Sequence, residues 1–377
     1  MKIREFEVER WMNDHEETCR YNLAETCVRS LTTAELLALS GRREEVLAEL
    51  EATPLTYGPI PGSLRLRLRR LVAGLYTAQG PDNVLITHGA IGANALVHST
   101  LVEPGDHVVA VVPTYQQHYS IPDSYGARVD HLPLREENGW LPDLDALDRL
   151  VTPDTRLIAV NNPNNPTGAL IDEAGLTRIA KIAERAGAWV LCDEVYRGVD
   201  QHGDGFTTSI ADLYERGIST GSMSKPFSLA GLRLGWIVGP TGLLADVATH
   251  RDYSTISVGR VDDLLACVAL ENKDAILARA HRITRTNLAV LDEWVTGRDD
   301  IGYVRPASGT TALLRYRAPI GSYAFCTRLL ERTGVMFTPG AAFGIEHTVR
   351  IGFADDTETL RTGLDLAGGF LDHLAQA

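Results

Sequence analysis

The chain has 377 residues, of which 44% are hydrophobic and 23% are charged, so it can bury a large core divided over two domains. Its formal charge of -13, from 36 basic and 49 acidic residues, disfavours nucleic acids and anionic membranes as partners, because both bind basic surfaces. No apolar stretch reaches the roughly 18 residues of a membrane span, and the charged first residues do not resemble a signal peptide. We therefore expect a cytoplasmic protein.

Strand and helix signals alternate through the middle of the chain. Short apolar runs, typical of strands buried on both faces, lie at Val84–Ile86, Val108–Val112, Leu157–Val160, Trp189–Cys192 and Leu234–Val238. Between the third and fourth runs, residues 173–186 follow the capping residue Asp172 and end before Gly187, as an amphipathic helix does. This alternation predicts an α/β fold with a mostly parallel central sheet that is covered by helices on both sides.

The pattern changes after about residue 272. A long helical pattern over residues 275–294 leads into alternating residues over 303–316, and a closing helix is expected from Asp356 onward. These signals indicate a second, smaller α+β domain, which the first residues join because they precede the first sheet signals. We expect a large domain over 46–275 and a small domain formed by 1–45 and 276–377.

The five cysteines form no C-x-x-C pair. An odd number with this spacing indicates buried thiols rather than a disulfide framework or a zinc cluster, and we expect no bound metal. They are Cys19, Cys27, Cys192, Cys267 and Cys326.

The segment Ser222-Met223-Ser224-Lys225 is the most informative one. It places a lysine amine beside hydroxyls, and Arg233 follows eight residues later within Gly231-Leu232-Arg233-Leu234-Gly235. Such a set supplies an amine for an imine bond and donors for a phosphate group. Alone, the lysine has an equally good interpretation as a surface residue in a loop.

Three further polar segments follow predicted strands. Asp193 and Tyr196 come at the end of an apolar run, where ligands collect in open α/β sheets, although both are also common turn residues. The turn Asn162–Gly168 leaves an asparagine amide free to donate, and Thr87–Gly92 joins a strand to a helix whose first N–H groups favour a phosphate. Asp193 is placed to keep a pyridine nitrogen protonated, and Tyr196 to bond a ring hydroxyl.

Taken in order, these motifs resemble the class I and II aminotransferases of pyridoxal 5'-phosphate (PLP) fold type I over nearly the whole chain. The resemblance implies that Lys225 carries PLP as a Schiff base, that Asp193 holds the pyridine nitrogen, and that Asn165 and Tyr196 hold the ring oxygen. Tyr115, in a P-x-Y motif, would stack on the ring. The phosphate would be held by Ser222, Ser224, Arg233 and the backbone of Ala90 and Ile91.

The resemblance also implies a shared site. Tyr57, in Tyr57-Gly58-Pro59, would reach the phosphate of the neighbouring subunit, which requires a homodimer. Arg350, in Thr348-Val349-Arg350-Ile351-Gly352, matches the arginine that binds the substrate α-carboxylate, and Asn165 would contact the substrate beside it. A guanidinium suits this task because it binds a carboxylate through two hydrogen bonds, whereas an arginine on a strand can also simply pair with a surface acid.

The N-terminal segment departs from the common family pattern, which has a G-x-P type of turn at this place. Here Glu9 lies in a helix-like stretch, and Asn22-Leu23-Ala24-Glu25-Thr26-Cys27 follows. A carboxylate of Glu9 or Glu25 that points into the pocket would suit a cationic side chain such as a guanidinium, and solvated glutamates are the equally weighted alternative. Thr26 would help to orient a leaving hydroxyl, while Asp200 and Asp204 are weaker candidates for the carboxylate.

The whole pattern, including this acidic N-terminal segment, most resembles the capreomycidine-synthase-like cyclases of antibiotic biosynthesis. That resemblance implies loss of water from a hydroxylated arginine and addition of its own guanidine to Cβ, closing a ring. An ordinary aminotransferase that passes an amino group to a 2-oxo acid is the alternative. A PLP-binding module without catalysis is disfavoured, because Lys225, Asp193 and Arg350 are all present.

Overall fold

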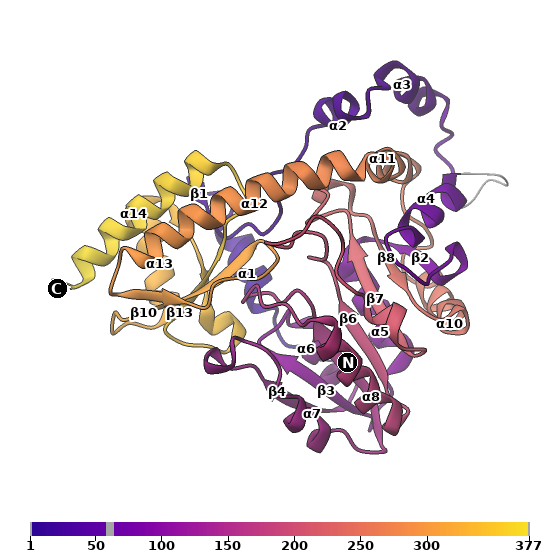
Figure 1. Ribbon diagram of the computed structural model, residues 1–377, viewed down its shortest axis with the longest axis horizontal. Helices are drawn as coiled ribbons and strands as arrows, with labels where there is room; N and C mark the ends of the chain where they lie inside the picture. Colours follow the sequence, from indigo (N-terminus) through magenta and orange to yellow (C-terminus); the bar gives the residue numbers. More distant parts are fainter. Residues whose placement is uncertain (1, 58–63, 376–377) are drawn as a thin grey trace.

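The computed structural model describes residues 2–57 and 64–375, and its centre is a seven-stranded sheet (Figure 1). The strand order is β2-β8-β7-β6-β5-β3-β4, with β8 antiparallel to both neighbours and the other pairs parallel. The strands are β2 (Val84–Thr87), β3 (His107–Val112), β4 (Arg128–Pro133), β5 (Thr155–Asn161), β6 (Trp189–Asp193), β7 (Gly217–Ser222) and β8 (Gly235–Val238).

Both faces of this sheet are covered by helices, because its strands are apolar on both sides. Val109, Ile158 and Val190 share one core with α7 (Leu144–Leu150) and α8 (Glu173–Ala186). Their chain neighbours Val108, Leu157 and Leu191 share the opposite core with α5 (Gly89–Leu101) and α10 (Thr241–Asp252). The predicted mostly parallel, doubly covered sheet is confirmed.

A smaller unit with antiparallel strands lies beside the large sheet. Its four-stranded sheet has the order β12-β13-β10-β9, and a separate parallel pair joins β1 to β11. The strands are β1 (Tyr21–Asn22), β9 (Ile301–Tyr303), β10 (Thr311–Tyr316), β11 (Val335–Met336), β12 (Thr338–Pro339) and β13 (Thr348–Gly352). A common core packs them against α12 (Lys273–Thr296), α13 (Ser322–Thr333) and α14 (Thr357–Ala375).

This unit agrees with the predicted smaller α+β domain, although the exact domain boundaries remain our proposal. The boundary near residue 275 falls inside α12, which in Figure 1 passes from the smaller unit across to the large one. Further helices of the large unit are α6 (Gln117–Ser124), α9 (Ile210–Leu213) and α11 (Arg260–Glu271). No helix among residues 2–57 and 64–375 is long and apolar enough to cross a membrane.

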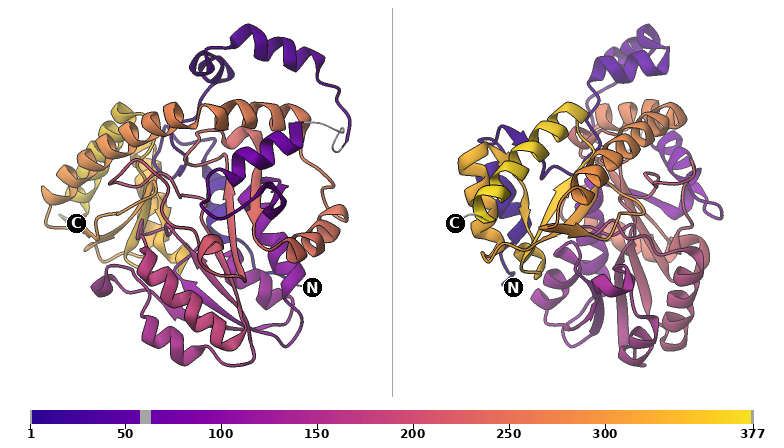
Figure 2. Two further views of the ribbon diagram at one scale, coloured as in Figure 1. Left: turned by 45° about the vertical axis from the view of Figure 1, so that its right-hand side comes forward. Right: turned by 60° about the vertical axis from the view of Figure 1, so that its left-hand side comes forward.

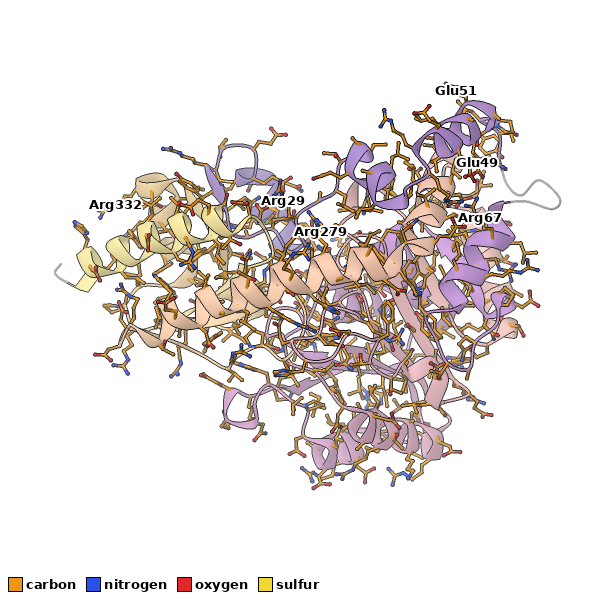
Figure 3. The ribbon with its side chains drawn as sticks, turned by 45° about the horizontal axis from the view of Figure 1, so that its top comes forward. Arg29, Glu49, Glu51, Arg67, Arg279 and Arg332 are labelled. Atoms are coloured by element: carbon orange, nitrogen blue, oxygen red, sulfur yellow. The ribbon has the colours of Figure 1, made fainter. Side chains whose placement is uncertain are left out.

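The N-terminal helices connect the two units. α1 (Glu7–His15) packs on the smaller unit, whereas α2 (Thr33–Ser40) and α3 (Arg43–Ala52) stand out from the body beside α11 (Figure 2). α3 is tied to the body by Arg67 of α4 (Leu64–Ala73), whose guanidinium lies 3.0 Å from Glu49 and 2.6 Å from Glu271. Figure 3 labels Glu49 and Arg67 at this contact between α3 and α4.

None of the five cysteines, all of which lie within the described residues, forms a disulfide. Four of them are buried, as expected from their apolar neighbours, and Cys19 is half-buried.

Candidate active site

The predicted site residues meet at one edge of the large sheet, because β5, β6 and β7 are parallel and end there together. Asn165, Asp193 and Lys225 follow these three strands and line one cavity of about 310 Å³. Arg350 of β13 closes this cavity from the smaller unit, and α1 contributes a further wall. The cavity therefore lies between the two sheets.

Lys225 lies on the floor of the cavity, with its side chain only 19% exposed. Its Nζ donates to the Thr26 hydroxyl at 2.6 Å and lies 3.4 Å from the Cys27 sulfur and 3.9 Å from a Glu25 carboxylate oxygen. Burial opposes the ammonium charge, but Cys27, Tyr196 and Glu25 together raise the pKa of Lys225. The segment 25–27 thus surrounds the amine on the side opposite the sheet.

Asp193 is held by several donors at the end of β6. Its Oδ2 accepts from Asn94 Nδ2 at 2.8 Å and lies 3.5 Å from His118 Nε2, while its Oδ1 accepts from the Val195 N–H at 3.1 Å. Asp193 is 3% exposed. These contacts fix the orientation of the carboxylate, so that it can pair with a ring N–H in the cavity.

A tight turn at the start of α5 forms one end of the cavity. Ala90 and Ile91 lie there beside Ser222, Ser224 and Arg233, and all five side chains or backbones line the cavity. Gly235 lets β8 lie close to the backbone of this turn, because a Cβ at Gly235 would lie only 2.7 Å from the Ala90 nitrogen. First-turn N–H groups, two hydroxyls and a guanidinium form a set that suits a phosphate.

Arg350 is buried at the opposite end of the cavity. Its Nη2 donates to the Ala24 carbonyl at 2.8 Å and to Thr338 Oγ1 at 3.0 Å, and its Nη1 donates to Asn165 Oδ1 at 3.3 Å. Its Nε has no hydrogen-bond partner within the described part of the chain. A buried guanidinium with an unsatisfied N–H is suited to bind a carboxylate from the cavity.

Both N-terminal glutamates that the sequence singled out line the cavity. Glu9 accepts from the Tyr115 hydroxyl at 2.6 Å, and this contact joins α1 to the segment after β3. Burial and Glu9 together raise the pKa of Tyr115. Glu25 accepts the N–H groups of Thr26 and Cys27 at 2.6 and 2.7 Å.

Burial opposes the ionisation of Glu25, but Lys225 and these N–H groups lower its pKa overall. By contrast, the weaker candidates Asp200 and Asp204 do not line the cavity. Asp200 accepts from Ser308, and Asp204 pairs with Arg285 at 3.2 Å.

Tyr57 lies away from the cavity of its own chain and is 82% exposed. Gly58 and Pro59, which complete its motif, lie outside the described residues. Tyr196 is buried at 3% exposure and lines the cavity, with its ring centroid 6.0 Å from Lys225 Nζ.

Several residues of the cavity wall, and His118 behind Asp193, carry no clear motif in the sequence. Asn94 lies one helical turn after Ala90, and an amide in a helix of small apolar residues was the available signal. His118 lies three residues after Tyr115, but nothing in the sequence distinguishes it from a core histidine. The other missed residues that line the cavity include Met12, Asn13, Glu16, Cys27 and Asn161.

Comparisons with known proteins agree with this geometry. Residues 40–365 match the aminotransferase class I and II family. The chain is 33% identical to the capreomycidine synthase of Streptomyces vinaceus over 359 residues, which cover 95% of this chain and 91% of that relative.

Solved structures give the same picture. A PLP-dependent aminotransferase from Streptococcus suis 89-1591 has a TM-score of 0.95 and 42% identity, with coverage of 99% of both chains. The PLP-dependent cyclase OrfR has a TM-score of 0.90 and 29% identity, with coverage of 99% of this chain and 98% of that chain. These matches confirm the predicted fold and PLP as the cofactor.

Proposed function

The chain belongs to the class I and II aminotransferase family, and on that premise we propose that it is a PLP-dependent cyclase acting on a hydroxylated arginine. In this reaction water leaves Cβ of the free amino acid, and the guanidine of the same molecule adds to Cβ. The likeness to capreomycidine synthase and to the cyclase OrfR supports this choice of reaction.

One observation carries the proposal: two carboxylates line the cavity that also holds Lys225 and Arg350. Glu9 has no ion-pair partner within residues 2–57 and 64–375, and Glu25 lies 3.9 Å from Lys225. A substrate whose α-carboxylate pairs with Arg350 would present its side chain to this anionic wall. A guanidinium matches such a wall in charge and in hydrogen-bond geometry.

The residues of the cavity fit PLP. Gly235 leaves room for the backbone of the turn at Ala90, Asp193 offers a buried carboxylate, and Lys225 lines the same cavity. When bound, PLP withdraws electrons from the substrate Cα, so that the proton there becomes acidic. The residues that would hold it are Lys225, Asp193, Asn165, Tyr196, Tyr115, Ser222, Ser224, Arg233, Ala90 and Ile91.

The chain's own groups then have separate tasks. Arg350, assisted by Asn165, binds the α-carboxylate and fixes which bond at Cα is broken. The Lys225 amine takes the Cα proton and returns it, and Thr26, 2.6 Å from that amine, orients the leaving hydroxyl. Glu9 and Glu25 hold the guanidine near Cβ, which makes ring closure effectively unimolecular.

A homodimer belongs to the same proposal. Leu55 and Tyr57 are 86% and 82% exposed beside the projecting helices α2 and α3, which is consistent with burial against a second copy. Tyr57 would then reach the phosphate in the partner's cavity. Measurement of the mass in solution tests the dimer, and a monomer that retains full activity would contradict it.

An ordinary aminotransferase is the second candidate, favoured by the family and by the likeness to the Streptococcus suis aminotransferase. In that case the amino group passes to a 2-oxo acid, and Glu9 and Glu25 do not touch the substrate.

The deciding experiment mixes the PLP-loaded enzyme with arginine or 3-hydroxyarginine in the absence of any 2-oxo acid. We expect repeated turnover of the hydroxylated substrate to a product lighter by one water, with the cofactor still in the PLP form. A single turnover that leaves the pyridoxamine form, with further product only after a 2-oxo acid is added, would establish the aminotransferase instead.

A further inference from the structure

Two buried histidines lie behind Asp193, on the side away from the cavity. His118 of α6 approaches Asp193 Oδ2 to 3.5 Å, and the ring of His98 meets the ring of His118 edge-on at a centroid distance of 5.8 Å. Both rings are fully buried. Within residues 2–57 and 64–375, none of their four nitrogens has a hydrogen-bond partner.

α5 brings His98 into this position by its helical period. Ala90, Asn94 and His98 are spaced by four residues and therefore lie on one face of the helix. Along this face, Ala90 lines the phosphate end of the cavity, Asn94 donates to Asp193, and His98 contacts His118. One face of α5 thus carries both a direct partner of Asp193, which is Asn94, and a residue that contacts its second neighbour His118, which is His98.

A buried imidazole without hydrogen bonds is costly to the fold. Leaving a buried polar group unpaired is unfavourable, so an apolar residue of similar volume would be more stable at this place. Burial, and then the neighbouring His118, lower the pKa of His98 to about 3, so the ring is uncharged at neutral pH. The titratable group that acts on His98 is His118, which in turn faces Asp193.

We propose that His98 is a positioning residue, which holds the His118 ring against Asp193 and thereby fixes the carboxylate that faces the pyridine nitrogen. The edge-on contact of the buried His98 ring limits rotation of the His118 ring, and an uncharged ring does so without placing a second charge near Asp193. This inference rests on the proposed place of Asp193 at the pyridine nitrogen, and it is independent of whether the enzyme is a cyclase or an aminotransferase.

The test reads the pyridine nitrogen directly, by NMR of the enzyme loaded with PLP that carries ¹⁵N in the ring. In the wild type we expect the signal of a protonated nitrogen at neutral pH. In His98→Leu the signal should move toward that of the unprotonated ring, because a loosened Asp193 holds the N–H less well. His98→Gln, which keeps a polar group but loses the ring that contacts His118, should not restore the wild-type signal.

Exchange of the Cα proton of arginine with deuterium gives a second readout. We expect His98→Leu to slow this exchange about tenfold, as is usual for residues that orient a catalytic group, with little change in the arginine concentration at half-saturation. Thermal stability should be equal or higher, because the unpaired imidazole is gone. Leu101→Met, a volume-conserving change in the last turn of α5, should change neither the signal nor the exchange.

A double-mutant cycle with His118→Leu identifies the route. If His98 acts through His118, His98→Leu has no further effect on the signal when His118 is already leucine. An unchanged ¹⁵N signal in His98→Leu, or the same added effect in both backgrounds, would overturn the proposal. Asp193→Asn serves as the reference variant: if it also leaves the signal unchanged, the proposed place of Asp193 fails, and the role of His98 fails with it.

Discussion

Glu9→Gln tests the anionic wall with the smallest possible change. The amide keeps the size of the side chain, and its oxygen can still accept from the Tyr115 hydroxyl, which donates to Glu9 at 2.6 Å. The change therefore removes the charge while it keeps the contact that joins α1 to the segment after β3. Any loss of affinity then reports the interaction between the carboxylate and the substrate.

The expected loss follows from the surroundings of Glu9. A hydrogen bond to a charged group contributes about 1.5 to 3 kcal/mol, and the half-buried position of Glu9 favours the lower end of that range. A loss of about 1.4 kcal/mol corresponds to a tenfold rise in Kd. We therefore expect arginine to bind Glu9→Gln about tenfold more weakly.

The assay titrates PLP-loaded enzyme with arginine and with citrulline and follows the cofactor absorbance. Citrulline has the same shape but no charge, so its affinity should change little in Glu9→Gln. Asp14→Asn removes one charge from the same helix without lining the cavity, and it should leave both affinities unchanged. An unaltered ratio of arginine to citrulline affinity in both Glu9→Gln and Glu25→Gln would refute the anionic wall.

Three further results are expected. Arg350→Lys should raise the substrate KM tenfold or more, because an ammonium cannot make the paired hydrogen bonds of a guanidinium; an unchanged KM in steady-state kinetics would remove the α-carboxylate from Arg350. Gly235→Ala should weaken PLP binding and lower the free energy of unfolding by about 1 to 3 kcal/mol, measured by cofactor titration and denaturant unfolding, because the new methyl group would press on the backbone at Ala90. The pKa of Glu25 is lower in the folded state, so its stabilising effect is present at neutral pH and is lost as the pH falls through that pKa. Glu25→Gln should therefore lower the free energy of unfolding at pH 7 and have a smaller effect at acid pH. An equal effect at both pH values would contradict the direction of the pKa shift.

Apolar runs predicted most of the large sheet, because its strands are buried on both faces. β7 was missed, since Gly217-Ile218-Ser219-Thr220-Gly221-Ser222 is fully buried yet mostly polar. Its hydroxyls have partners far away in the sequence: Ser219 donates to Glu194, and Thr220 donates to Asn94. β4 was missed as an edge strand, whose exposed residues give no continuous apolar run. Neither kind of strand can be recognised without its neighbours.

The cofactor end of the site could be expected from motifs, because each motif follows a strand and the strands end together. The substrate wall was harder to predict. Glu9 reaches the cavity only because α1 packs on the smaller unit, where the Trp11 indole donates to the Phe337 carbonyl across 326 residues of sequence. Glu25 is held close to Lys225 by Gly352, where a side chain would collide with the Glu25 carbonyl. Such long-range contacts leave no local signal in the sequence.

The central claim is that Lys225 carries PLP, and covalent trapping tests it most directly. Reduction of the PLP-loaded enzyme with borohydride fixes the cofactor to the lysine that bears it, and peptide mass analysis then identifies that lysine. We predict the added mass on the peptide that contains Lys225, and no trapped cofactor or turnover in Lys225→Ala. Cofactor trapped on another lysine of the wild type, or normal turnover in Lys225→Ala, would contradict the account.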